Sequence, residues 1–166
     1  GGSAHELAPL NPYLYGGTAG VAYFLACHAA VTGDRRHHDL MLKALEPLRA
    51  SLTGTDAKAT AQAIGLGAAS GLGGAIYTLT AIATLTNTPE LLHDAQAIAA
   101  LATPDLIACD RTPDVLGGCA GLILALLGLE RITRTRNLID QAIACTGPID
   151  PETIPLTGFA HGKAGA

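Results

Sequence analysis

A Gly-x-x-Gly turn recurs four times along the chain, and the first three copies stand directly before an apolar segment. The four turns occupy residues 17–20, 71–74, 118–121 and 162–165. Their first glycines are 54, 47 and 44 residues apart, a period that fits a repeat in which each unit adds a pair of helices. We expect units at about 11–55, 64–105 and 114–147, and the start of a fourth at 156–166.

Two kinds of helix alternate in these units. The segment after a turn is apolar on nearly all sides, as at 21–26 and 122–127, which indicates burial all round. The next segment carries one apolar stripe, formed for example by Leu91, Ala95 and Ile98, so its opposite face meets water. The alternation predicts an inner and an outer layer. The expected fold is all-α, a partial double-layered α/α toroid that occupies residues 1–166 as one truncated domain.

Polar breaks separate the expected helices. Asp34 suits an N-cap, Pro89 suits the first turn of a helix, and Pro47 is expected to end or kink the first outer helix. The glycines that open the inner helices need an explanation, because a glycine inside a helix costs about 1 kcal/mol relative to alanine. Either the inner layer packs so tightly that it needs them, or the turns gather at one end and form a site.

Composition excludes several classes of partner. The chain has 10 Lys and Arg residues and 14 Asp and Glu residues, which gives a formal charge of -4. It lacks a basic stripe that could bind nucleic acid or an anionic membrane. The N-terminus lacks the pattern of a secretory signal, and the longest apolar runs are shorter than the roughly 20 residues that span a bilayer. We therefore expect a cytoplasmic protein.

The cysteines do not form a metal-binding pattern. Cys27, Cys109, Cys119 and Cys145 include no C-x-x-C pair and are expected mostly as small buried residues. Cys27 and His28 are adjacent, but neighbouring side chains on a helix diverge by about 100° and do not converge on one ion. Cys119 lies inside the third turn, where a helix N-terminus lowers the pKa of a thiol, although burial explains such a cysteine more often.

Two other residues are candidates for chemistry because of their place in the repeat. His161 directly precedes the fourth turn, and Asp114 lies four residues before Gly118 in the third. Both would face the mouth that the turns surround. A cap for the following helix is the simpler interpretation of Asp114, and a hydrogen-bonded structural histidine is the simpler interpretation of His161.

The last residues begin a fourth unit whose inner helix does not follow in this sequence. We expect the chain to be a fragment whose uncovered apolar surface favours self-association or pairing with the missing half.

The motifs together resemble the lanthionine cyclase family. The resemblance rests on four segments, taken in order along nearly the whole chain: LYGGTAGVA at 14–22, ASGLGG at 69–74, DVLGGCAG at 114–121 and LTGFAHG at 156–162. The last segment is similar to the C-terminal cyclase domain of class II lanthipeptide synthetases.

The resemblance implies a double-layered α/α toroid that forms thioether rings in a precursor peptide. A cysteine thiolate adds to dehydroalanine or dehydrobutyrine, and the resulting enolate takes a proton. The resemblance gives His161 an acid–base role and Asp114 an orienting role. From their place at the first and third turns, we also expect Tyr15, Gly117 and Gly118 among the substrate-binding residues. The family holds a catalytic zinc in Cys-Tyr-Gly-like and Cys-His-Gly motifs that this sequence lacks. We therefore name no metal ligand, and expect zinc only in a full-length parent.

Three functions remain open on these grounds. The first is a part of a lanthionine cyclase that is inactive by itself. The second is a non-catalytic helical repeat that binds a peptide or a protein partner across the mouth. The third, an α/α toroid enzyme acting on carbohydrate or prenyl substrates, is least favoured, because few acidic or aromatic residues lie near the mouth.

Overall fold

The computed structural model describes residues 9–112, 114–150, 152 and 154–165, and their regular structure is helical. Within these ranges the only β-type pairing is an isolated bridge between Leu156 and Gly162. The expectation of an all-α chain is confirmed. The helices are α1 (Thr18–Thr32), α2 (Arg35–Thr53), α3 (Ala57–Ile64), α4 (Leu72–Thr86), α5 (Glu90–Ala99), α6 (Pro104–Ala108), α7 (Cys119–Thr133) and α8 (Asn137–Ala144).

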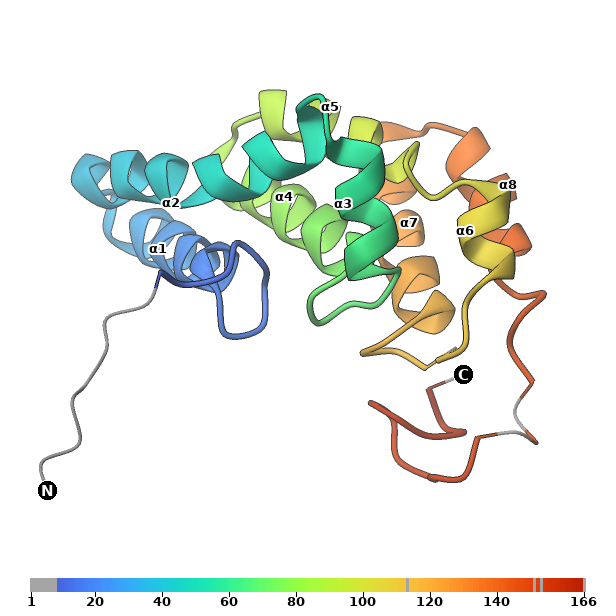
Figure 1. Ribbon diagram of the computed structural model, residues 1–166. Helices are drawn as coiled ribbons and strands as arrows, with labels where there is room; N and C mark the ends of the chain where they lie inside the picture. Colours follow the sequence, from blue (N-terminus) through green and yellow to red (C-terminus); the bar gives the residue numbers. More distant parts are fainter. Residues whose placement is uncertain (1–8, 113, 151, 153, 166) are drawn as a thin grey trace, which may run out of the picture.

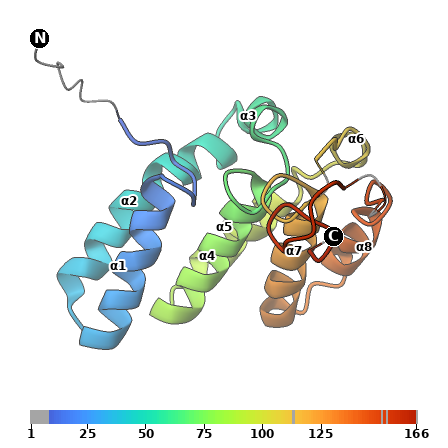
Figure 2. The same cartoon turned by 90° about the horizontal axis from the view of Figure 1, so that it is seen from below.

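The helices form two layers, as Figures 1 and 2 show. Helices α1, α4 and α7 lie side by side in an inner row, and each of them begins at a glycine turn. Helices α2, α5 and α8 cover this row, each packed on the inner helix that precedes it in the chain. The two layers match the expected helical-pair repeat. The described pairs form an open row, not a closed ring.

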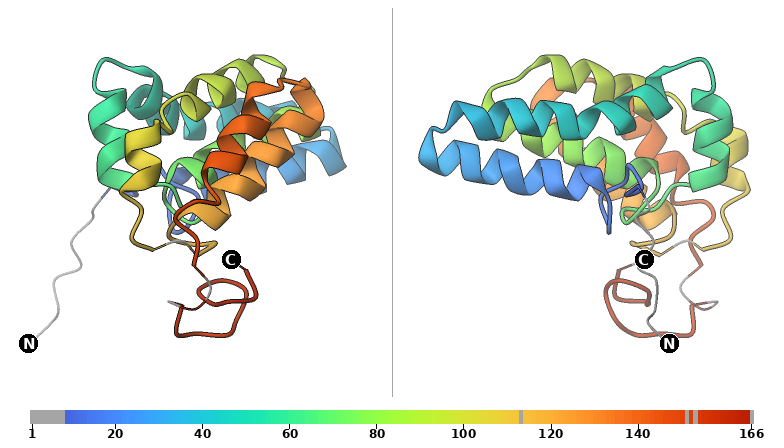
Figure 3. Two further views of the ribbon diagram at one scale, coloured as in Figure 1. Left: turned by 90° about the vertical axis from the view of Figure 1, so that its right-hand side faces the viewer. Right: turned by 60° about the vertical axis from the view of Figure 1, so that its left-hand side comes forward.

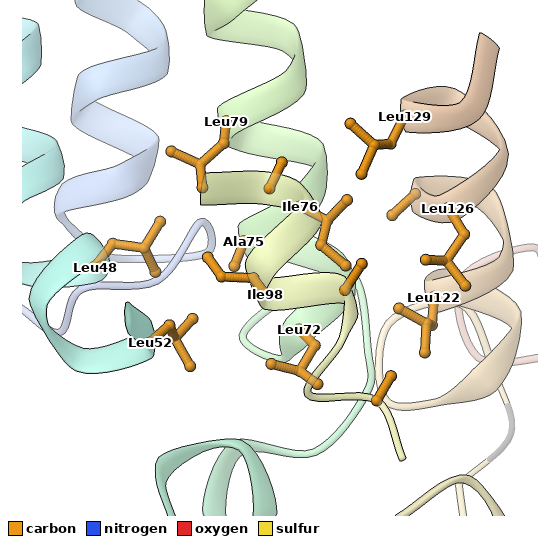
Figure 4. Packing of buried hydrophobic residues seen from close by; sticks show 14 of the residues in the cluster. Leu48, Leu52, Leu72, Ala75, Ile76, Leu79, Ile98, Leu122, Leu126 and Leu129 are labelled. Atoms are coloured by element: carbon orange, nitrogen blue, oxygen red, sulfur yellow. The ribbon is translucent and has the colours of Figure 1, made fainter. Parts of the chain in front are cut away.

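Burial along the inner row agrees with the sequence expectation only for the middle helix, α4. Ten of the 15 residues of α4 are buried, because α4 has an inner neighbour on both sides. Figure 4 shows Ile76 of α4 between Leu48 of α2 and Leu126 of α7. Only three of the 15 residues of α1 are buried, and Phe24 is 67% exposed. The prediction of burial all round is therefore wrong for α1, and also for α7, where Leu124 is 52% and Leu127 44% exposed, because each of these helices has an inner neighbour on one side only.

Helix α2 continues through Pro47 to Thr53, so Pro47 does not end the helix. The alternative, a kink at Pro47, stays a prediction. An interior proline costs a helix about 3 kcal/mol. Four side chains of α2 lie in the core on both sides of the proline, and each is worth about 1.5–3 kcal/mol on burial. These four are Met41, Leu45, Leu48 and Leu52. Their packing outweighs the loss.

Short helices and caps complete the connections. The sequence did not predict α3 and α6, which lead from an outer helix to the next glycine turn. Asp34 caps α2 as expected, since its carboxylate accepts the N–H of Arg36 at 2.9 Å. Pro89 precedes α5 as its N-cap residue. Among the described residues, no helix combines the length and the apolarity needed to cross a bilayer.

Candidate active site at the glycine-turn end

The glycine turns gather along one edge of the inner layer, the lower edge in Figure 1. Backbone hydrogen bonds join each turn to the next at one equivalent position, two residues before the first glycine. Tyr15 N–H donates to Ala69 O at 2.9 Å, and Ala69 N–H donates to Leu116 O at 3.1 Å. Leu116 N–H then donates to Ala160 O at 3.1 Å. These bonds form a ladder that brings residues from four distant segments to one place.

The last glycine of each turn is required by close packing. A Cβ atom added to Gly121 would overlap the carbonyl oxygen of Val115, six residues earlier. The same overlap with the residue six positions earlier would arise at the other three turns, between Gly20 and Leu14, Gly74 and Ala68, and Gly165 and Phe159. The chain thus crosses the start of its own inner helix, where only glycine fits. Tight packing explains these glycines, and it also shapes the edge on which the candidate residues lie.

Asp114 lies in the loop before α7 and is almost fully buried, with 9% of its side chain exposed. Its Oδ1 accepts the N–H of Gly117 at 2.6 Å, and its backbone carbonyl accepts the N–H of Gly118 at 3.0 Å. The carboxylate accepts no N–H of α7, so a side-chain cap, the simpler interpretation, is wrong. The cap comes from Asp110, whose Oδ2 accepts the N–H of Cys119 at 2.7 Å.

His161 and Asp114 contact each other directly. His161 Nδ1 lies 2.8 Å from Asp114 Oδ2, and the two residues are 47 positions apart in sequence. A carboxylate only accepts hydrogen bonds, so Nδ1 carries the proton of this bond. The imidazole is 55% exposed, in contrast to the buried carboxylate. The arrangement is an imidazole oriented by a carboxylate, with its second nitrogen left to act as an acid or a base.

A cavity of about 390 Å³ adjoins this pair. Arg111 and Thr112 line one side, and Ile154, Pro155 and Leu156 add an apolar wall. The volume lies within the roughly 300–1,000 Å³ of small-molecule sites. Figure 3 shows the C-terminal segment, which carries His161, folded back beneath α7. The site is therefore assembled from the third and fourth turns.

The other predicted site residues lie differently. Gly117 belongs to the site through its N–H, which holds Asp114. Gly118 is buried, and a Cβ there would overlap the carbonyl oxygen of Thr112. Tyr15 is 78% exposed, joins the ladder through its backbone, and does not line the cavity beside His161. The substrate-binding roles of these three residues stay predictions.

The expectation that the cysteines are mostly buried is confirmed for two of the four. Cys119 and Cys145 are buried, Cys27 is half-buried and Cys109 is exposed. Contact with the Cys145 thiol raises the pKa of the Cys119 thiol, and burial and the Asp110 carboxylate raise it further. Burial, not activation by a helix N-terminus, thus describes Cys119. Within the described part of the chain, no group of three His, Cys, Asp or Glu side chains is placed to hold a metal ion.

Sequence reasoning missed Asp110. Its Oδ1 accepts the N–H of Thr112 at 3.0 Å while Oδ2 caps α7. An Asp two residues before a Thr, in a loop that leads to a glycine turn, is typical of a side-chain turn in which the carboxylate accepts the N–H two residues on. That local signal could have identified the turn, but not the bond to Cys119.

These features define a class of protein: a two-layered helical repeat with glycine turns at one edge and a carboxylate–imidazole pair between two of them. The family model described as lanthionine synthetase C-like protein matches residues 8–166. The chain belongs to the lanthionine synthetase C-like family, and it is a lanthionine cyclase-type domain. Comparison with curated proteins finds no significant match.

Proposed function

We propose that this chain supplies the acid–base pair of a cyclase that forms thioether rings in a precursor peptide. The hydrogen bond between His161 and Asp114 is the observation that carries the proposal. The pair lies between glycine turns, beside a cavity, in a chain of the lanthionine synthetase C-like family. The substrate we propose is a peptide containing cysteine and dehydroalanine or dehydrobutyrine.

The proposed reaction needs a positioned acid. When a cysteine thiolate attacks the β-carbon of the dehydro residue, a C–S bond forms and the electrons of the C=C bond move to the carbonyl oxygen, giving an enolate. The proton that completes the product goes to the α-carbon. We assign its delivery to Nε2 of His161, because Nδ1 is occupied by Asp114. The product then keeps the new C–S bond, and the neutral imidazole is left behind.

Asp114 makes His161 suited to this step. A buried carboxylate at 2.8 Å from Nδ1 fixes the orientation of the ring and leaves Nε2 free to deliver the proton. Gly117 N–H holds the carboxylate from its other side. Asp114 is therefore proposed as the orienting residue, and His161 as the acid.

The resemblance also implies zinc, and the described residues do not fit it. No group of three suitable side chains is present among them, and the sequence lacks the two cysteine motifs of the family. The steps proposed for this chain are therefore proton transfer and positioning only. We propose that these 166 residues have no cyclase activity alone, and that they act within a longer protein of the class II lanthipeptide synthetase type.

A cyclisation assay tests the proposal. A longer protein that contains this chain and binds zinc would be given a dehydrated precursor peptide, and loss of free thiol would be followed by alkylation and mass spectrometry. His161→Ala should slow ring formation by about 10²–10⁴-fold with the zinc content unchanged. His93→Ala is the matched control, since His93 is exposed on α5. Equal rates for the two variants would remove His161 from the mechanism.

A further inference from the structure

We infer that Asp110 is a positioning residue that holds the loop carrying Asp114 in the form that reaches His161. The geometric part of this inference stands on the structure of the loop, and only its effect on catalysis rests on the proposed function.

The third glycine turn is anchored differently from the other three. In those turns, the residue after the first glycine donates its N–H to a backbone carbonyl seven residues earlier. The pairs are Thr18 and Asn11 at 2.8 Å, Leu72 and Gly65 at 2.9 Å, and Lys163 and Leu156 at 2.9 Å. At the third turn the corresponding donor, Cys119, bonds to the Asp110 carboxylate at 2.7 Å. A side chain has taken the place of the backbone acceptor.

The new acceptor comes from a side-chain turn that starts two residues further from the glycine turn than the one in the first unit. Asn11 begins a side-chain turn six residues before Gly17, accepting the N–H of Tyr13 at 2.9 Å. Asp110 begins the same kind of turn eight residues before Gly118, accepting the N–H of Thr112 at 3.0 Å. The backbone keeps its place, since a Cβ at Gly118 would overlap the carbonyl oxygen of Thr112, six residues earlier, just as a Cβ at Gly17 would overlap that of Asn11. Asp114 lies between the side-chain turn of Asp110 and Gly118.

The carboxylate of Asp110 closes the loop at both ends. Oδ1 holds the start through Thr112, and Oδ2 holds the end through Cys119. The same carboxylate contributes to the raised pKa of the Cys119 thiol. Gly118 makes the approach possible, because a Cβ there would overlap Oδ2. Asp114, between the two anchored ends, then directs Oδ1 to Gly117 and Oδ2 to His161.

Asp110 acts through other residues and not on the substrate. It does not line the cavity beside His161, although its neighbours Arg111 and Thr112 do. It faces a separate hollow shared with α6 and the end of α8. Its effect on chemistry therefore passes through the loop, which separates it from the acid–base pair.

The test is a spectroscopic signature of the His161–Asp114 bond in this chain. Nitrogen-15 NMR at alkaline pH reports which ring nitrogen of His161 carries the proton, and the intact bond requires Nδ1. Asp110→Asn keeps an acceptor for Thr112, as Asn11 has for Tyr13, but replaces one carboxylate oxygen with an amide that cannot accept. We expect the Nδ1–H population of His161 to fall in Asp110→Asn and further in Asp110→Ala. Asp140→Asn, an exposed change of the same charge on α8, should leave it unchanged.

Circular dichroism shows whether each variant keeps its helix content. If Asp110→Ala loses helix content, the inference is tested on Asp110→Asn alone. A folded variant in which His161 keeps the wild-type tautomer would overturn the inference. In the cyclisation assay, Asp110→Asn should lower kcat about 10–100-fold, as small misplacements of a catalytic group do, with little change in KM. If His161→Ala leaves the cyclisation rate unchanged, the proposed function fails. The NMR result then still tests whether Asp110 positions Asp114 against His161.

Discussion

Leu116 and Ala160 are joined by a backbone hydrogen bond of 3.1 Å, and this bond places the candidate acid–base pair. Asp114 lies two residues before Leu116, and His161 directly follows Ala160. Because the bond belongs to a ladder that also includes Tyr15 and Ala69, the position of the pair depends on the repeat itself. The glycine turns thus serve packing and site geometry together.

The ladder predicts a pattern of amide hydrogen exchange. The N–H groups of Tyr15, Ala69 and Leu116 should be protected, because each has a backbone acceptor in the next turn. The N–H of Ala160 has no backbone acceptor among the described residues and should exchange faster. Exchange measured by NMR in deuterated buffer checks this. A Leu116 amide that exchanges as fast as that of Ala160 would mean that the fourth turn does not dock on the third in solution.

Two glycines of α7 provide a matched pair of substitutions. Gly121→Ala places a Cβ against the carbonyl oxygen of Val115 and should lower the free energy of unfolding by about 1–3 kcal/mol. Gly128→Ala meets no atom within 4 Å and should raise it by up to about 1 kcal/mol, the helix preference of alanine over glycine. Urea unfolding of the two variants and wild type gives both values. Equal effects at the two positions would contradict the close crossing of the turn.

The cysteines should differ in reactivity. Cys109 is exposed and should react with a thiol reagent first, followed by the half-buried Cys27. Cys119 and Cys145 should stay unmodified until the chain unfolds, because both are buried and the raised pKa of Cys119 keeps its thiol protonated. Timed alkylation with peptide mapping measures the order. Early labelling of Cys119 would show that the third turn is open.

Asp34 predicts a pH-dependent contribution to stability. The Arg36 side chain, together with the Arg36 backbone N–H, holds the pKa of the Asp34 carboxyl well below its usual range. Its unfolded value is about 3.9, so the contribution is complete well above that pH and is lost progressively as pH falls from there through the folded-state value. Asp34→Ala should therefore lower the melting temperature at pH 7, and the difference should narrow progressively in acid.

Asp56→Ala is the control for this measurement, since Asp56 precedes α3 without a side-chain cap bond. It should change the melting temperature much less than Asp34→Ala does. Similar losses at pH 7 for the two variants would argue against the cap and the ion pair at Asp34.

The sequence predicted those parts of the fold that depend on local pattern. Glycine turns and apolar periodicity identify the paired helices because each signal lies within one helix and its turn. The outer stripe of Leu91, Ala95 and Ile98 is buried as expected. Exposure of Phe24 was not predictable in this way, because it depends on how many inner neighbours α1 has, which no local pattern records.

The sequence predicted the location of the candidate site but not the contacts within it. The repeat placed Asp114 and His161 at one mouth, but their bond joins residues 47 apart and depends on the folded loops. Asp110 was missed for the same reason: its partner Cys119 is nine residues away across a loop. Local sequence patterns predict where the helices and turns lie. The contacts between loops depend on how the folded helices bring distant turns together, which no local pattern records.

The stereochemistry of the ring provides the most direct test of the central claim, that His161 delivers a proton to an enolate held at this edge. A positioned acid protonates one face of the enolate, so a zinc-containing protein that includes this chain should yield a single diastereomer of the thioether. We predict that His161→Ala yields a mixture of diastereomers, while His93→Ala retains one, as measured by chromatography of the hydrolysed and derivatised product. A single diastereomer formed at the wild-type rate by His161→Ala would contradict the account.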